Sequence, residues 1–193
     1  TLDGGSGNDT VDYSAMGTGV TVNLSTGTSG GAAANDHLVS IESIIGTNQA
    51  DTLTAASGTL SLYGGGGDDV INITSGQLAT FSGIIDGGGG TNTLNAAGGD
   101  LQAASAYITH VGAADVHNGS AGGAFALTAA AIQQIVGSGT SSDLTFTMDS
   151  GDTFTATTTA GVTVTPTVHD ATYTHYDYIQ GGLTIAQIEV HKV

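Results

Sequence analysis

GGGGDDVIN, at residues 64–72, is the most informative stretch of this chain. Its first half is rich in glycine and carries a carboxylate, Asp69, at the sixth position, and its eighth residue is the large apolar Ile71. Glycine adopts positive φ without steric cost, so the first half predicts a tight turn whose carbonyl oxygens face one way. The second half predicts a short strand that turns one apolar side chain inward. One nonapeptide therefore makes half a coil, and two nonapeptides make a full coil.

The same nine-residue frame recurs along the first half of the chain. Residues 4–12 (GGSGNDTVD) fit it in full, with Asp9 at the sixth position and Val11 at the eighth. Three degenerate copies follow at residues 31–39 (keeping Asp36 and Leu38), 46–54 (keeping Asp51 and Leu53) and 87–95 (keeping Leu94, with Asn92 in place of aspartate).

The spacing of the copies predicts how they stack. Asp51 and Asp69 are separated by the length of two nonapeptides, which places their loops one above the other on the same edge. Asp69 and Asn92 are separated by more than that length, so this second coil needs a bulge of five residues. Residues 20–24 (VTVNL) are expected to add a strand between the first full motif and the stacked loops.

The chemistry of these loops favours a calcium site. Calcium takes six to eight oxygen ligands at flexible geometry. Carbonyls and one carboxylate per turn supply half of such a shell, and a stacked second turn supplies the rest. Nonapeptides of this form are a signature of calcium-binding β-helix repeats. Because stacked carboxylates repel one another without a cation, we expect calcium binding and folding to be one event at millimolar calcium.

The repeats resemble the RTX (repeats-in-toxin) family of secreted bacterial proteins over residues 1–95, about half of the chain. Further stretches are similar to a spacer and to the closing segment of very large RTX surface proteins, namely residues 9–14, 19–24, 36–42 and 50–54, and residues 151–193. The resemblance implies an all-β fold, a right-handed parallel β-roll or β-helix solenoid with calcium between stacked loops. It also implies export by a type I system and folding outside the cell.

The resemblance also implies the metal ligands, which in the family are the first four backbone carbonyls of each loop and the aspartate at its sixth position. The ligands implied here are Gly4, Gly5, Ser6, Gly7 and Asp9; Asp36; Gly46, Thr47, Asn48 and Asp51; and Gly64, Gly65, Gly66, Gly67 and Asp69. Two loops depart from the family pattern, because Gln49 replaces the fourth glycine and Asn92 carries no charge.

The glycine loops fade after residue 95, and short strand-like pieces continue. We assign residues 1–125 to the roll and residues 126–193 to a β-rich continuation and C-terminal cap. Alternating apolar and threonine positions predict strands at residues 144–148, 153–155, 162–164 and 183–193. Helical turns are predicted at residues 100–107, with Asp100 as N-cap, and at residues 128–136. Pro166 and the tyrosine-rich residues 173–178 indicate a different packing near the end.

Composition excludes several partners. The chain has 193 residues, with 17 acidic residues against one basic residue, Lys192, and a formal net charge of -16. Nucleic acid and anionic membrane surfaces are therefore not expected as partners. No apolar run reaches the ~18 residues of a membrane span, so direct membrane insertion is not expected. The chain lacks cysteine, which excludes disulfides and thiolate metal sites. It opens inside a motif at Thr1, so we expect it to be an internal or trailing piece of a longer polypeptide.

Several motifs typical of catalysis are missing from the sequence. There is no H-E-x-x-H or P-loop pattern, and only two glutamates are present. The histidine–aspartate neighbours at residues 169–170 and 175–177 could form a metal or acid/base cluster, but they are interpreted as polar strand positions with exposed tips. His110, Asp115 and His117 could form a second such cluster, but nothing in the sequence fixes their geometry. We predict a non-enzymatic, calcium-dependent structural module of a bacterial cell-surface protein, such as an adhesin, a surface layer or an extracellular filament. Its expected partners are calcium ions, copies of itself joined end to end or laterally, or a surface glycan.

Two alternatives stay open at this point. The chain could be an accessory calcium module that folds and exports an attached RTX exoenzyme. The threonine tracts at residues 153–159 and 162–167 could instead form a flat ladder that binds carbohydrate or ice, although threonine is also a common strand residue.

Overall fold

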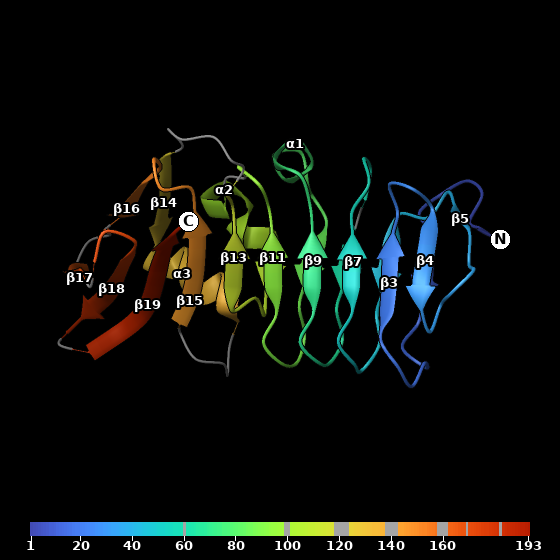
Figure 1. Cartoon of the computed structure of the whole chain (residues 1–193), viewed down its shortest axis with the longest axis horizontal. Helices are drawn as coiled ribbons and strands as arrows, with labels where there is room; N and C mark the ends of the chain where they lie inside the picture. Colours follow the sequence, from blue (N-terminus) through green and yellow to red (C-terminus); the bar gives the residue numbers. More distant parts are fainter. Residues whose placement is uncertain are drawn as a thin grey trace.

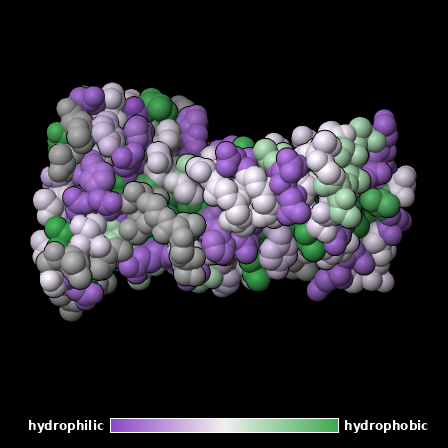
Figure 2. Space-filling view, turned by 90° about the horizontal axis from the view of Figure 1, so that it is seen from below, coloured by the Kyte–Doolittle hydropathy of each residue, from purple (hydrophilic) through white to green (hydrophobic). Residues whose placement is uncertain are grey.

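The computed structural model describes residues 1–59, 61–98, 101–117, 124–137, 143–157, 162–168, 170–181 and 183–193. Over these residues the protein is mostly β, and its short strands stand side by side along the long axis of the molecule (Figure 1). Figure 2 shows a narrow N-terminal part and a broader C-terminal end. No helix in this described part of the chain is long and apolar enough to span a membrane.

One sheet has five strands, all parallel. Its strands, in spatial order, are β12 (Ile108–Thr109), β10 (Ile84–Asp86), β8 (Ser61–Tyr63), β6 (Ser43–Ile45) and β2 (Thr10–Asp12).

The second large sheet has ten strands and is mixed. Its seven central strands are parallel and are β3 (Val20–Asn23), β7 (Thr52–Thr54), β9 (Val70–Asn72), β11 (Thr93–Asn95), β13 (Ala113–Asp115), β15 (Asp143–Met148) and β19 (Leu183–Lys192). Antiparallel strands flank them, with β4 (Thr28–Gly31) at one end and β18 (Tyr173–Gln180) and β17 (Val162–Val168) at the other.

From β6 to β13 the chain alternates between the two sheets, and the predicted spacing is confirmed. Leu53 pairs with Ile71, which lies two nonapeptides later, and Ile71 pairs with Leu94 across the longer coil. The extra residues of that coil lie between β9 and β10, where the short helix α1 (Ser75–Leu78) forms at the upper edge in Figure 1.

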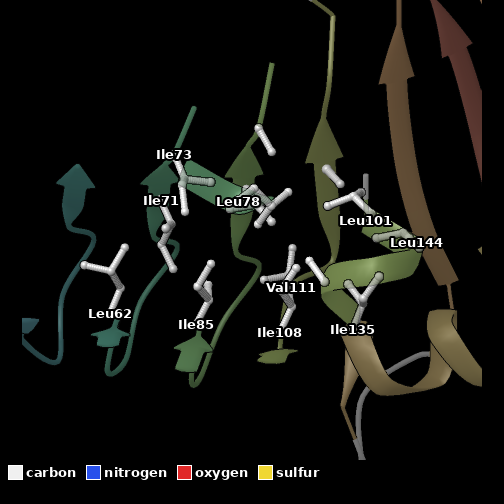
Figure 3. Close-up of a cluster of buried hydrophobic side chains, with 14 of the residues drawn as sticks. Leu62, Ile71, Ile73, Leu78, Ile85, Leu101, Ile108, Val111, Ile135 and Leu144 are labelled. Atoms are coloured by element: carbon white, nitrogen blue, oxygen red, sulfur yellow. The ribbon is translucent and has the colours of Figure 1, made fainter. Parts of the chain in front are cut away.

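The core lies between the two sheets. The apolar residue at the eighth position of each stacked repeat is fully buried, as Leu53, Ile71 and Leu94 show. The five-stranded sheet contributes a facing row, of which Leu62, Ile85 and Ile108 are labelled in Figure 3. Burial of one such side chain stabilises the fold by about 1.5–3 kcal/mol, so this continuous row holds the thin layers together.

The N-terminal end contains strands that the repeat pattern did not predict. The predicted strand at residues 20–24 is confirmed as β3, but it also forms a hairpin with β4. After that reversal the chain crosses to β5 (Leu38–Val39), which pairs with β1 (Leu2–Asp3) in a separate two-stranded sheet.

The C-terminal end departs from simple alternation. The predicted helical turns are confirmed as α2 (Leu101–Ala104) with a 3₁₀ turn η1 (Ser105–Tyr107), and as α3 (Ala129–Val136). Thr128 caps α3, because its side chain accepts a hydrogen bond from the Ala131 N–H. Asp100, the predicted cap of the first turn, lies outside the described residues.

The strands predicted after residue 140 are all present. Besides β15, β17 and β19, β16 (Thr153–Thr157) forms a parallel pair with β14 (Ala124–Thr128). The proposed boundary at residue 125 falls inside β14. Pro166 lies in the edge strand β17, where a residue without an N–H costs no interior hydrogen bond.

Candidate metal-binding loops

Three glycine-bearing loops stack on one edge of the molecule. Residues 46–51, 64–69 and 87–92 each join a strand of the five-stranded sheet to a strand of the ten-stranded sheet. They lie along the lower edge in Figure 1. Main-chain hydrogen bonds link neighbours: the Gly66 N–H donates to the Thr47 carbonyl (2.9 Å), and the Gly89 N–H donates to the Gly65 carbonyl (2.8 Å).

The sixth residues of these loops form a buried ladder. The Asp51 N–H donates to Asp69 Oδ1 (2.8 Å), and the Asp69 N–H donates to Asn92 Oδ1 (2.9 Å). Asp51, Asp69 and Asn92 are only 2%, 1% and 0% exposed. Asp69 and Asn92 therefore each accept, through a side-chain oxygen, a hydrogen bond from the main-chain N–H of the sixth residue in the preceding loop. These hydrogen bonds fix the register in which the loops stack.

The two aspartates of the ladder differ in how many hydrogen bonds the protein donates to their carboxylate oxygens. Both oxygens of Asp51 accept hydrogen bonds: Oδ1 from the Val20 N–H (2.7 Å) and the Thr47 hydroxyl (3.1 Å), and Oδ2 from the Thr47 N–H (2.5 Å). Asp69 Oδ2 is buried and has no hydrogen-bond partner. Burying a carboxylate oxygen without a partner is costly, so Asp69 is the member of this ladder that fits a cation.

The electrostatics of Asp69 agree with this interpretation. Desolvation by burial raises the pKa of its carboxyl to about 7, and the charges of Asp51 and Asp68 act in the same direction, against the hydrogen bond from the Asp51 N–H. Without a cation, the ionised form is therefore poorly stabilised at neutral pH.

The first glycine of each motif is required by packing. A Cβ added to Gly64 would lie 2.2 Å from Asp69 Oδ2 and 2.5 Å from the Gly87 carbonyl oxygen. A Cβ on Gly46 would meet Asp51 Oδ2 and the Gly64 carbonyl oxygen at 2.4 and 2.3 Å. A carboxylate and a carbonyl thus converge on the same glycine, and this is the donor set that calcium takes.

Loop conformation separates residues 46–51 from the loops that keep glycine at the second and fourth positions, namely residues 4–9, 64–69 and 87–92. Gly65 and Gly67 have positive φ of 105° and 94°, and the same two positions of residues 4–9, Gly5 and Gly7, have φ of 85° and 127°. In residues 46–51 these positions are Thr47 and Gln49, neither of which has positive φ. The departure seen in the sequence is therefore also a departure in backbone shape.

The loop at residues 4–9 lies away from this ladder. This loop precedes β2, whereas the other three loops follow β6, β8 and β10. Because β2 is parallel to β6, the loop lies at the opposite ends of the strands of the five-stranded sheet. It packs instead on residues 40–42, where the Asp9 N–H donates to Glu42 Oε2 (2.9 Å). Asp9 Oδ2 is buried without a hydrogen-bond partner, like Asp69 Oδ2.

Asp36 was expected to serve as a metal ligand, but the structure places it neither in the stacked loops nor in the loop at residues 4–9. Its carboxylate accepts a hydrogen bond from the Tyr13 hydroxyl (3.3 Å), and the Tyr13 side chain is buried at the N-terminal end of the core. The reason is the reversal at β4, which removes residues 31–39 from the stacking frame.

The positions of the other predicted ligands follow from these loops. The backbones of Gly64, Gly65, Gly66 and Gly67, and of Gly46, Thr47 and Asn48, belong to the stacked edge, whereas Gly4, Gly5, Ser6 and Gly7 belong to the opposite edge. Over the described ranges, no group of three or more histidine, aspartate or glutamate side chains is placed to hold a metal ion. A calcium site would therefore depend on backbone carbonyls.

Three histidines lie beside aspartates, and one of them, His175, also lies near Glu189. His110 Nδ1 lies 2.6 Å from Asp86 Oδ1, His117 pairs with Asp115, and His175 Nε2 lies 3.1 Å from Asp177 Oδ1. His169 lies outside the described residues.

Sequence reasoning missed Glu42 as the neighbour of the first motif. It lies 33 residues from Asp9 and outside any repeat, so no spacing signal pointed to it.

No protein-family model matches this chain, and no curated protein matches it.

Proposed function

We propose that this protein is a calcium-stabilised β-roll module, right-handed and non-catalytic, that forms part of a secreted bacterial cell-surface protein. Parallel strands in two sheets, joined by stacked glycine loops, support the roll. The repeats at residues 4–12 and 64–72 support the assignment of calcium as the bound ion, since they carry the RTX pattern in full.

The observation that carries the proposal is the unpartnered, buried Oδ2 of Asp69. We place the calcium at Asp69, with the carboxylate and the carbonyls of residues 64–67 and 87–90 as its ligands. Asp51 is a poorer ligand than its motif implied, because protein donors already occupy both of its oxygens. A second site would use Asp9 with Glu42 at the opposite edge.

Calcium bound at such loops would couple folding to the environment. A ligand that binds only the folded chain stabilises it by about 2.7 kcal/mol when its free concentration is 100 times Kd. Sites of extracellular modules have Kd of about 10⁻⁴–10⁻³ M, so a calcium-poor cytosol leaves them empty and an extracellular medium fills them. This is the behaviour required of a chain that is exported unfolded and folds at the cell surface.

The test compares urea unfolding of the whole chain in chelator and in calcium, for the natural sequence and for Asp69→Asn. The asparagine keeps an acceptor for the Asp51 N–H but removes the charge. We expect calcium to raise the unfolding midpoint of the natural chain and to do so much less for the variant. Asp68→Asn is the matched control, because Asp68 is an exposed neighbouring carboxylate.

The same samples give a pH dependence with a defined sign. The pKa of Asp69 is about 7 in the folded chain against an ordinary 3.8, so the folded chain binds more protons than the unfolded chain between about pH 4 and 7. In chelator, the free energy of unfolding is therefore expected to fall as pH rises through this window. In Asp69→Asn this pH dependence should be weaker. Equal calcium responses of the natural chain and Asp69→Asn would contradict the proposed site.

A further inference from the structure

A pocket at the C-terminal end has no role in the proposed calcium site. It has a volume of about 320 Å³ and lies between β16 and the inner side of β18 and β19, where the turn after β17 forms its rim. This volume is at the lower end of the range of small-ligand pockets, about 300–1,000 Å³.

The floor of the pocket is aromatic. Phe154 of β16 and Tyr176 of β18 both line it, with ring centroids 5.2 Å apart and planes tilted by 53°. Phe146 supports Phe154 from behind at 5.6 Å, and Val190 is buried beside them. These contacts fix the rings, so the floor is a preformed apolar surface of the kind on which a flat ring can lie.

Polar groups surround this floor, and two of them have hydrogen-bonding capacity to spare. No hydrogen bond of the Tyr176 hydroxyl is formed with the part of the chain that the structure describes. Lys192 donates one hydrogen bond to the Asp152 carbonyl (3.0 Å), and an ammonium has three donors. At the rim, Asp170 Oδ1 accepts from the N–H and the hydroxyl of Thr172, both at 2.7 Å, which holds its carboxylate in place.

The charges of the pocket favour an uncharged ligand. Lys192 is the only basic residue of a chain whose formal net charge is -16, and it shares the pocket with Asp170. The field of the whole protein repels anions, and the Lys192 ammonium that lines the pocket opposes a cation. A neutral molecule with an apolar face and several hydroxyls matches both the aromatic floor and the mixed donors and acceptors around it.

We propose that this pocket binds a neutral sugar, the terminal hexose unit of a glycan. The C–H face of the sugar ring lies on Phe154 and Tyr176. Its hydroxyls take hydrogen bonds from the Tyr176 hydroxyl and the Lys192 ammonium, and donate to the Asp170 carboxylate. This inference adds a ligand to the proposed surface module, but its geometry is independent of the glycine loops.

The experiment is saturation-transfer NMR on the whole chain in calcium buffer, with the methyl glycosides of glucose, galactose, mannose and N-acetylglucosamine as probes. We expect at least one probe to bind. Tyr176→Phe removes only the hydroxyl and should weaken that binding roughly 2–10-fold. Tyr107→Phe is the matched control, because Tyr107 is an exposed tyrosine of η1 that does not line the pocket, and it should change nothing.

A second variant keeps the test decisive if Tyr176→Phe lowers stability. Lys192→Met keeps most of the side-chain length and removes the donors, and it should also weaken sugar binding. The proposal is overturned if none of the probes binds, if both variants bind as the natural chain does, or if the anionic sugar N-acetylneuraminate binds more tightly than every neutral one. Loss of the calcium response in urea would leave this result unaffected, so the two proposals fail separately.

Discussion

At the scale of single residues, the first glycine of each stacked loop has a role that its backbone angles do not reveal. Gly64 does not have positive φ, so its role is not to permit a left-handed turn. It leaves room for the carboxylate of its own motif and for a carbonyl of the next loop. The aspartate at the sixth position and the glycine at the first are therefore one packing unit.

Gly64→Ala tests this unit. The new Cβ would lie 2.2 Å from Asp69 Oδ2 and 2.5 Å from a backbone oxygen, and the backbone cannot move away without breaking the stack. We expect a loss of about 1–3 kcal/mol in the free energy of unfolding, measured by urea titration.

Gly76→Ala is the control for this substitution. Gly76 lies in α1 with open space around it and without positive φ. Alanine there should leave stability unchanged or raise it by up to about 1 kcal/mol. Equal losses at Gly64 and Gly76 would show that the loops have no special packing.

At the scale of elements, each strand is too short to be stable alone and gains its stability from the facing row of side chains. The stacked strands β7, β9 and β11 have three residues each and bury only the central one. The alternation in the sequence predicted which residue points inward. The pairing of β3 with β4 and of β18 with β17 was not predicted, because an antiparallel partner leaves no trace in the nonapeptide frame.

Ile71→Ala tests the contribution of one central residue. Ile71 is fully buried in the middle of the stack (Figure 3), so the truncation leaves a cavity between two sheets. We expect a loss of about 2–5 kcal/mol. Ile84→Ala removes the same atoms from a strand position that is 45% exposed and should cost less than about 1 kcal/mol. Similar costs, measured by urea unfolding, would contradict the assignment of the core.

At the scale of the whole molecule, charge opposes compaction. A formal charge of -16 on 193 residues, with one basic residue, leaves almost no internal ion pairing beyond histidine. Self-repulsion of this kind destabilises the folded state, and cations relieve it either by screening or by binding. The two effects differ in their dependence on concentration and on the identity of the ion.

Salt titrations separate screening from binding. In chelator, raising sodium chloride from about 0.01 to 0.1 M shortens the screening length from about 30 to 10 Å and should raise the thermal unfolding midpoint gradually. Calcium chloride should produce a larger rise at about 1 mM, whereas magnesium chloride at the same concentration should not, since magnesium demands a rigid octahedral shell. Equal effects of calcium and magnesium would show that only screening operates.

Local features of the chain follow from its sequence alone. The repeat spacings, the inward apolar positions, the two helical turns and most of the C-terminal strands depend on φ preferences and short-range periodicity, which neighbouring residues set. Contacts between distant segments do not follow in this way. Asp51 and Asp69 occupy the same motif position, yet only the folded chain brings the remote Val20 N–H onto Asp51 and leaves an oxygen of Asp69 without a partner. Glu42 beside Asp9, and the C-terminal pocket, likewise arise where remote strands meet, and a one-dimensional pattern carries no record of that packing.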